Sequence, residues 1–148
     1  MLQLKVKIVY NKKIKGDYFH LALQSPGIAK DSSPGQFLMV QVSIKHFPVP
    51  LRKSPKVIAE DNFLDIKIND VYEPLLRRPL SIHRVRGDNI ELFYEVVGKA
   101  TQILSHRKPG GYLDVIGPLG NGFTCPLTAN RYLLAVFVAG AMGVAPLV

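Results

Sequence analysis

The chain has 148 residues, of which 47% are hydrophobic and 20% are charged. This composition is typical of one globular domain, and it excludes a disordered chain because no low-complexity tract is present. Nineteen basic against eleven acidic residues give a formal charge of +8. That excess favours an anionic partner, such as a nucleotide, a nucleic acid or an acidic protein surface. The single cysteine, Cys125, excludes an internal disulfide framework.

Neither end of the chain has the pattern of a targeting or membrane segment. The first residues alternate apolar side chains with Gln and Lys, so they are read as a strand, and we expect a cytoplasmic protein. The stretch 132–148 has no charged residue, but two glycines and a proline interrupt it. It is too short and too broken for a membrane span, and a buried strand that runs into a glycine turn fits it better.

The amino-terminal third predicts a hairpin followed by a third strand. Residues 2–10 and 17–24 have period-two alternation, and the polar residues 11–16 form the turn between them. Residues 25–36 show no periodicity, so no regular element is expected there. The alternation resumes at 37–44, which is the third predicted strand.

The middle of the chain predicts an insertion and then a second hairpin. Residues 45–72 begin with a basic, proline-rich stretch and contain two short apolar runs, which indicates an inserted loop or hairpin. Residues 78–85 and 89–97 are predicted strands, and Gly87 and Asp88 supply the turn that joins them.

The last third predicts a helix, a strand and the start of another unit. Residues 100–108 have helical spacing and stop at Pro-Gly-Gly. Residues 111–123 give one more strand and a glycine-rich corner. The apolar run 131–140 is typical of a parallel strand that is buried on both faces. The chain is therefore predicted to be mainly β, a six-stranded antiparallel Greek-key barrel with one short helix, followed by the first strand and glycine turn of a truncated α/β nucleotide-binding lobe.

The stretch LLRRPLSI at 75–82 points to an anionic ligand. The adjacent guanidinium groups of Arg77 and Arg78 repel each other and resist burial, so a nearby anion explains them better than core packing does. A strand carrying Arg78 and Ser81 directs a bidentate guanidinium at a phosphate and a hydroxyl at a heteroaromatic ring edge. By itself the pattern also fits an edge strand with solvated arginines.

Three later stretches also fit a nucleotide site. In VVGKAT at 96–101 a helix begins after a glycine, so its free amides and Lys99 form an anion site. In GPLGNGF at 117–123 the glycines permit a tight turn against a flat ligand. In AGAMGVAPLV at 139–148 a glycine turn follows the apolar strand, as it does where α/β nucleotide sites begin. Taken singly, the first also fits an ordinary capped helix and the second a corner between domains.

In combination, five segments resemble the flavin-binding half of the ferredoxin-reductase-like flavoproteins in order and spacing. These segments are PGQF at 34–37, RRPLSI at 77–82, VVGKAT at 96–101, GPLGNGF at 117–123 and VAGAMGVAPL at 138–147. Within that superfamily the chain looks most like the electron-transfer subunits of dihydroorotate dehydrogenase. Reductase subunits of sulfur and glutamate metabolism share these motifs.

The resemblance implies an FAD laid across the barrel, with Arg78 on the pyrophosphate and Ser81 near the isoalloxazine. The backbone of the same strand would contact the ring system, and the helix start would take the diphosphate. The residues implied are Pro79, Leu80 and Ile82 for the ring, Gly98, Lys99, Ala100 and Thr101 for the diphosphate, and Gly140 and Gly143 on the nicotinamide side. Because the cofactor would carry the chemistry, the resemblance requires no catalytic acid or base in this chain. The four histidines have no metal-ligand spacing, so no metal ligand is expected.

The chain departs from the family pattern in three places. It has GKAT where relatives usually have G-K-G-T, so Ala100 impedes a close backbone approach if that position needs a positive φ. It has GAMG where the lobe usually opens with G-G-I-G, which puts phosphate contact at Ala141 in doubt. The stretch 45–72 is also longer than relatives usually have there. The favoured interpretation is a tolerated loop insertion, and the alternative is a segment that shields the flavin or contacts a partner.

The resemblance predicts residues 1–128 as the FAD-binding barrel and 129–148 as the start of a truncated NAD-binding lobe. Relatives continue into that lobe and, in the dihydroorotate type, into a cysteine cluster that holds [2Fe-2S]. The chain stops just after the first strand and turn of that lobe, so NAD is not supported by this chain. One cysteine cannot supply the thiolates of the cluster, so [2Fe-2S] is not supported either. We therefore expect a fragment or truncated product that binds FAD and is inactive with NADH when isolated.

The leading hypothesis is a redox subunit in which FAD passes electrons from NADH towards an iron–sulfur centre and a partner dehydrogenase, with dihydroorotate dehydrogenase of pyrimidine biosynthesis favoured. The alternative is a reductase subunit of another ferredoxin-reductase-like complex, in sulfur or glutamate metabolism. A basic barrel that binds single-stranded nucleic acid is a distant alternative. Its aromatic residues are scattered rather than grouped into a stacking platform, so we expect no nucleic acid as partner, and we expect no membrane partner either. The resemblance implies a hetero-oligomer with a catalytic subunit.

Overall fold

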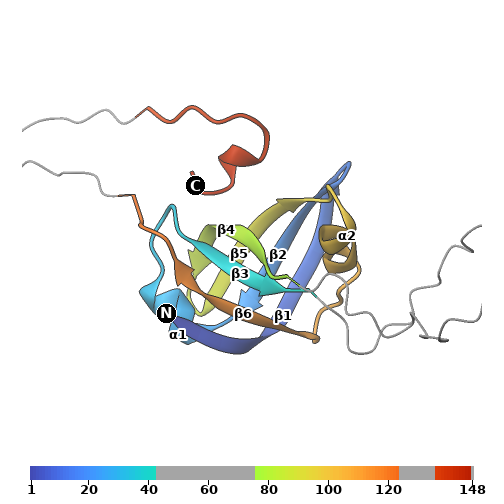
Figure 1. Cartoon of the computed structure of the whole chain (residues 1–148), viewed down its shortest axis with the longest axis horizontal. Helices are drawn as coiled ribbons and strands as arrows, with labels where there is room; N and C mark the ends of the chain where they lie inside the picture. Colours follow the sequence, from blue (N-terminus) through green and yellow to red (C-terminus); the bar gives the residue numbers. More distant parts are fainter. Residues whose placement is uncertain (43–75, 124–135, 148) are drawn as a thin grey trace, which may run out of the picture.

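The structure, a computed structural model, describes residues 1–42, 76–123 and 136–147. Six strands close into a barrel in the order β1, β2, β5, β4, β3, β6 (Figure 1). Their bounds are β1 Leu2–Lys15, β2 Tyr18–Gln24, β3 Phe37–Gln41, β4 Arg78–Arg86, β5 Asn89–Glu95 and β6 Tyr112–Leu119. All neighbouring strands are antiparallel, and β2 lies beside β5 rather than β3, which is a Greek-key connection. The predicted six-stranded barrel is confirmed.

Some predictions fall on parts of the chain that the structure does not describe. The insertion at 45–72 with its hairpin, the boundary at 128, Cys125 and the first half of the apolar run 131–140 lie outside the described residues.

The barrel interior is filled by aliphatic side chains that alternate along the strands, as the period-two patterns predict. Each such side chain contributes about 1.5 to 3 kcal/mol when it is fully buried. The fully buried set includes Ile8, Leu21, Leu23, Leu38, Val40, Ile90, Leu92 and Val115. This core makes the barrel a rigid support for the residues at its rim.

The first hairpin is longer than the sequence predicts. Residues 11–15 belong to β1 rather than to a turn, and the chain reverses at Gly16, whose φ is +54°. Polar residues fit in this part of the strand because residues 12–15 are all exposed to solvent. The pairing of β1 with β2 skips Val9 and Ile14, so each is an extra residue in a β-bulge. The bulge at Val9 changes which side chains face inward and turns Asn11 towards the interior.

Two short helices lie at opposite sides of the barrel, α1 Pro26–Asp31 and α2 Lys99–Ser105 (Figure 1). The second confirms the predicted helix, with bounds shifted by one to three residues. The first corrects the expectation that 25–36 has no regular element. Its six residues are too few for a visible period, but Pro26 occupies the first turn and Ile28 is completely buried against the barrel.

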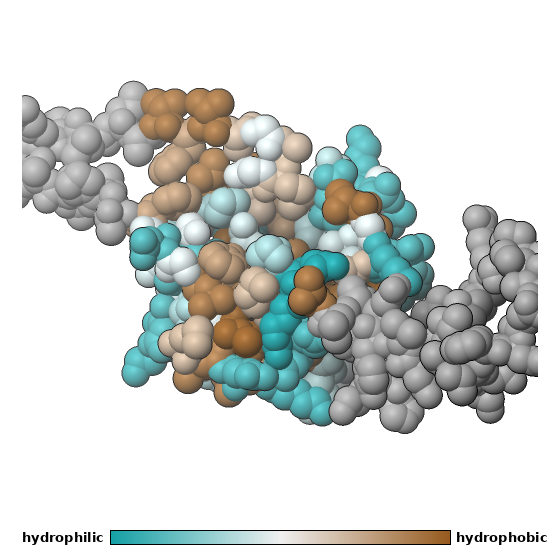
Figure 2. Space-filling view, in the orientation of Figure 1, coloured by the Kyte–Doolittle hydropathy of each residue, from teal (hydrophilic) through white to brown (hydrophobic). Residues whose placement is uncertain are grey.

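The carboxyl-terminal segment 136–147 differs from its prediction. Residues 136–140 form no strand and are exposed, with Val138 at 92% exposure. A buried parallel strand needs paired strands along its edges and layers packed on its faces. No described residue pairs with 136–140, so the predicted strand is wrong over these residues. It is followed by a short 3-10 helix, η2 Ala141–Val144. The exposed apolar side chains form the brown surface above the barrel in Figure 2.

Within the described ranges, no helix has the length and apolar character needed to cross a bilayer.

Candidate functional site

A cleft of about 290 Å³ lies where β4, β5, the start of α2, and η2 with the residue that follows it meet. Its walls are mostly apolar. The lining residues are Arg78, Pro79, Leu80, Ser81, Phe93, Tyr94, Glu95, Val97, Thr101, Met142 and Ala145. The cleft therefore brings together three stretches that the sequence singled out separately: RPLS, GKAT and GAMGVAP.

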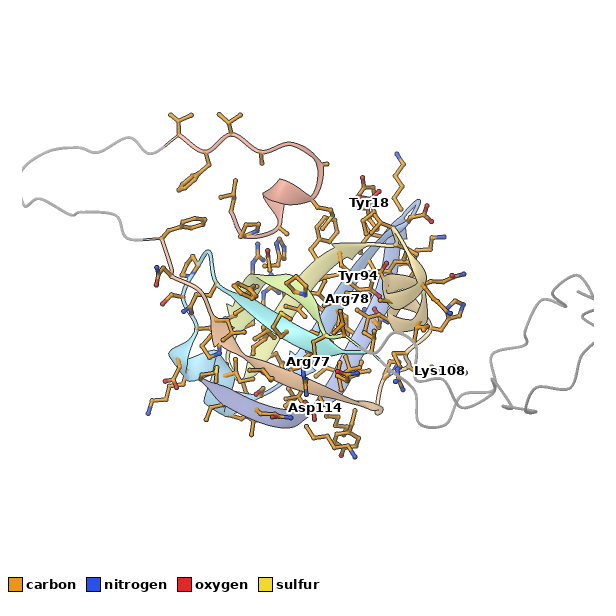
Figure 3. All side chains as sticks on the ribbon, viewed as in Figure 1. Tyr18, Arg77, Arg78, Tyr94, Lys108 and Asp114 are labelled. Carbon is orange, nitrogen blue, oxygen red and sulfur yellow. The ribbon has the colours of Figure 1, made fainter. Side chains whose placement is uncertain are left out.

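The two adjacent arginines have different surroundings. Arg77 precedes β4, and its Nη2 lies 2.7 Å from Asp114 Oδ1, while its Nη1 donates to the Asp114 carbonyl at 3.1 Å. Arg78 lines the cleft, and its side chain makes no hydrogen bond or ion pair with any described residue. Figure 3 shows Arg77 beside Asp114, and Arg78 beside Tyr94. Of these two arginines, Arg78 is the one available for an anionic ligand.

The RPLS strand presents three more residues to the cleft and turns the next one away. Pro79, Leu80 and Ser81 pair with β3 and line the cleft. Ile82 is 3% exposed in the core, and its backbone N–H donates to the carbonyl of Gln36 at 2.9 Å. Ile82 does not line the cleft, so its predicted contact with a ring system has no support from this geometry.

The start of α2 lies beside this strand. Thr101 Oγ1 accepts the backbone N–H groups of Val97 and Gly98 at 3.0 and 3.3 Å and donates to the Gly98 carbonyl at 3.1 Å. The threonine hydroxyl therefore caps its own helix. Ala100 is buried and has helical backbone, so the position needs no positive φ and tolerates alanine in place of glycine. Lys99 and Gly98 are exposed next to the cleft residue Thr101.

The sequence is similar to known electron transfer subunits over nearly its whole length. It is 35% identical over 146 residues to dihydroorotate dehydrogenase B (NAD(+)), electron transfer subunit, of Desulforamulus reducens, covering 97% of this chain and 44% of that protein. The subunit of the same name from Lysinibacillus sphaericus is 34% identical over 148 residues, covering 98% and 46%. The chain is a homologue of these electron transfer subunits. It spans less than half of their length.

Solved structures agree on the fold. The structure of an NADH-dependent reduced ferredoxin-NADP oxidoreductase, described for flavin-based electron bifurcation, is 29% identical with a TM-score of 0.56, covering 80% of this chain and 34% of that one. The ferredoxin reductase in carbazole 1,9a-dioxygenase has a TM-score of 0.63 at 20% identity, covering 97% and 36%. No family model matches the chain. The barrel is thus of the ferredoxin-reductase-like type.

Two motifs of this homologous region do not line the cleft and contact each other. Gln36 Nε2 donates to the Gly120 carbonyl at 2.9 Å, and the Phe123 N–H donates to the Pro34 carbonyl at 2.8 Å. The Phe123 ring lies over Gly35, whose φ is +89°. PGQF and GPLGNGF therefore form one corner, and their glycines are explained by packing rather than by ligand approach.

The two glycines predicted on the nicotinamide side flank the cleft without lining it. Gly140 precedes η2 and Gly143 lies within it, whereas Met142 and Ala145 of the same stretch do line the cleft. Ala141 has a φ of +46°, in the left-handed region that glycine adopts more readily. The structure thus brings this motif to the cleft through its apolar side chains.

Sequence reasoning missed Asn11, which was assigned to a turn. Its Nδ2 donates to the carbonyls of Leu104 and Arg107 at 2.8 and 3.1 Å, at the end of α2. Its Oδ1 accepts from the hydroxyl of the cleft residue Tyr94 at 3.1 Å. Burial raises the pKa of Tyr94 to about 12, with the Asn11 hydrogen bond acting in the opposite direction. No sequence signal marks Asn11, because a bulge determines its inward direction.

Sequence reasoning also gave no role to the histidines. His20 Nε2 lies 3.2 Å from Oε2 of Glu91, which is 5% exposed, and Arg86 Nε lies 3.6 Å from Oε1 of the same carboxylate. Burial is the main reason that the pKa of His20 lies below its ordinary value. His83 Nδ1 lies 2.8 Å from the carbonyl oxygen of Ala145, a residue that lines the cleft. Within the described residues, no three His, Cys, Asp or Glu side chains gather as a metal site.

Proposed function

We propose that this chain binds FAD, and that the whole protein passes electrons from NADH through this FAD towards an iron–sulfur centre and a partner, dihydroorotate dehydrogenase. The observation that carries the proposal is the placement of Arg78, which has no partner among the described residues, in one cleft with Thr101 at the start of α2. A diphosphate only accepts hydrogen bonds and a guanidinium only donates them, so the two are complementary.

The rest of the cleft fits a flat ring beside a charged group. Leu80, Phe93 and Met142 supply apolar contact, and Ser81 supplies a hydroxyl for a ring edge. Glu95 also lines the cleft, and since its carboxylate repels phosphate, we assign it to the sugar-like part of the ligand. About 290 Å³ holds part of a dinucleotide, so the remainder would extend over the surface near Lys99.

When bound, FAD accepts a hydride and releases electrons singly. The chain's own residues bind and orient it: Arg78 neutralises the diphosphate, and Pro79, Leu80 and Ser81 hold the ring. Gly98, Lys99, Ala100 and Thr101 complete the phosphate side. Because the chain spans less than half of its relatives, NADH oxidation and electron transfer to a partner are proposed for the whole protein. The cytoplasmic location stays a prediction from the sequence.

The test is a titration of the purified chain with FAD, followed by flavin fluorescence and absorbance. We expect saturable 1:1 binding, with FMN much weaker because it lacks the diphosphate and adenosine. ADP should compete with FAD. A protein that neither copurifies with flavin nor changes the signal of added FAD contradicts the proposal. A parallel titration with a single-stranded oligonucleotide should show no binding, whereas salt-sensitive binding there would favour the nucleic-acid alternative.

The rate of flavin reduction by NADH should distinguish the isolated chain from the whole protein. Under anaerobic conditions we expect the flavin of the isolated 148-residue chain to be reduced slowly or not at all. The whole protein should be reduced rapidly, and it should pass electrons to dihydroorotate dehydrogenase rather than to reductase partners of sulfur or glutamate metabolism. Rapid reduction of the isolated chain would contradict this division.

A further inference from the structure

His83 occupies an irregular position on β4, two residues after the last β4 residue that lines the cleft, Ser81. In the pairing of β4 with β5, Ile82 lies opposite Leu92 and Arg84 opposite Glu91, so His83 is an extra residue in a β-bulge. A bulge breaks the ladder locally and re-aims the side chain that it carries. The position of His83 is therefore set by the backbone and not by simple alternation.

The side chain is aimed at the carboxyl-terminal segment. His83 Nδ1 lies 2.8 Å from the Ala145 carbonyl oxygen. A carbonyl only accepts, so Nδ1 carries the proton and donates it. Ala145 is 2% exposed and is the buried residue of the described segment 136–147. Ala145 and its hydrogen bond to His83 thus mark the point at which this segment is attached to the barrel.

A partly buried cluster of polar and aromatic side chains holds the His83 ring in place. The ring meets His20 edge-on, with centroids 5.6 Å apart, and lies 5.8 Å from the Phe93 ring on β5. His20 in turn contacts Glu91, a carboxylate that points out of the barrel and is nevertheless buried. Burying a carboxylate is costly unless it is paired, and barrel packing does not need one here. Its pairing with His20 fixes the ring against which His83 packs.

We propose that His83 is a positioning residue that fastens residues 141–147 to the barrel as one wall of the cleft. The contacts of His83 support this role. It contacts Phe93 on β5 and Ala145 in the carboxyl-terminal segment, and both of these residues line the cleft together with Met142. This inference rests on the proposed FAD site for its functional consequence: the wall lies against the bound flavin and limits its contact with solvent.

The first test needs no flavin. Amide hydrogen exchange of 141–147 is measured in the FAD-free protein and in the variants His83→Ala, His83→Asn and His83→Gln. Loss of one hydrogen bond should raise exchange in His83→Ala by about five- to tenfold. His83→Asn should restore protection because its amide nitrogen replaces Nδ1, and His83→Gln should not. His106→Ala, which removes an exposed histidine at the end of α2, should match the wild type. Equal exchange in wild type and His83→Ala, or no rescue by Asn, overturns the proposal.

The second test uses the FAD-loaded protein. Iodide quenching of flavin fluorescence and the FAD dissociation rate should both rise in His83→Ala and return towards the wild-type values in His83→Asn. If exchange of 141–147 changes as expected but the wild type binds no FAD, the attachment by His83 stands and the proposed function fails. If FAD binds and neither quenching nor dissociation changes in His83→Ala, the role of His83 at the flavin is overturned.

Discussion

The guanidinium of Arg77 lies 2.7 Å from the carboxylate of Asp114 and also donates to the Asp114 backbone carbonyl. This pair ties the start of β4 to β6 across the intervening strand β3. Arg78, the next residue, has no such partner among the described residues and lines the cleft. Two arginines that are adjacent in sequence thus have separate tasks, one in the fold and one in the site.

Replacing Arg78 should affect FAD and not the fold. Arg78→Ala should weaken FAD binding by about 2 to 5 kcal/mol, because it leaves a phosphate charge without its donor. The free energy of unfolding of the FAD-free protein should stay within about 0.5 kcal/mol of the wild type. Flavin titration and urea denaturation measure the two quantities. An unchanged FAD affinity would refute the role of Arg78.

Replacing Arg77 should have the opposite effect and serves as the matched control. Arg77→Ala should lower the free energy of unfolding by about 1 to 2 kcal/mol, since it removes a half-buried ion pair and a hydrogen bond to the backbone. FAD affinity of the folded variant should be close to that of the wild type. A double-mutant cycle with Asp114→Asn isolates the pairwise energy. Additive effects of the two substitutions would show that the pair contributes nothing.

Asn11 should be a strong determinant of stability although it is polar. Asn11→Ala removes the donors to the Leu104 and Arg107 carbonyls and the acceptor for Tyr94, so unfolding should become easier by about 2 to 3 kcal/mol. Tyr94→Phe removes one of these bonds and should cost about 1 kcal/mol. Urea denaturation checks both. A smaller loss for Asn11→Ala than for Tyr94→Phe would contradict this account of how α2 is held.

Replacing Ala141 with glycine should stabilise the turn at 141–147. Its φ of +46° strains an L side chain by about 1 kcal/mol, part of which is offset by the greater freedom of glycine in the unfolded chain. Ala141→Gly should therefore increase protection of 141–147 against hydrogen exchange by about two- to fivefold. Gly143→Ala is the control, because its φ is not positive and an added Cβ meets no atom within 4 Å. Lower protection in Ala141→Gly would show that the turn is not strained.

The strands of the barrel were predictable because the alternation of apolar and polar residues is a local pattern. The features that the sequence did not predict were either too short to show a pattern, as in α1, or dependent on distant residues. The six residues of α1 show no period, so only burial of Ile28 reveals the helix. Bulges at Val9 and His83 add one residue to a strand without a sequence mark, and they shift every later side chain. Asn11 was assigned to a turn because residues 11–16 are polar, and the bulge that directs it inward has no mark in the sequence.

The candidate site was predictable as a set of motifs but not in its details. RPLS and GKAT indicated an anion site, and the structure brings Arg78 and Thr101 to one cleft. Which arginine is available depends on Asp114, a residue far away in the sequence on another strand. The contact of His83 likewise depends on Ala145, which is 62 positions further along the chain. Such pairs form only when the barrel closes.

His20 should make stability depend on pH near neutrality. Burial lowers its pKa from the ordinary value of 6.5, and this exceeds the opposing effect of Glu91. The unfolded chain therefore binds a proton at a higher pH than the folded chain does. The free energy of unfolding should fall as the pH is lowered through 6.5 towards the folded pKa, and this contribution should level off below it. Urea denaturation between about pH 8 and pH 5 should show the loss in the wild type. In His20→Gln, whose amide still donates to Glu91, the pH dependence should be weaker, and an identical profile would mean that His20 is not the group responsible.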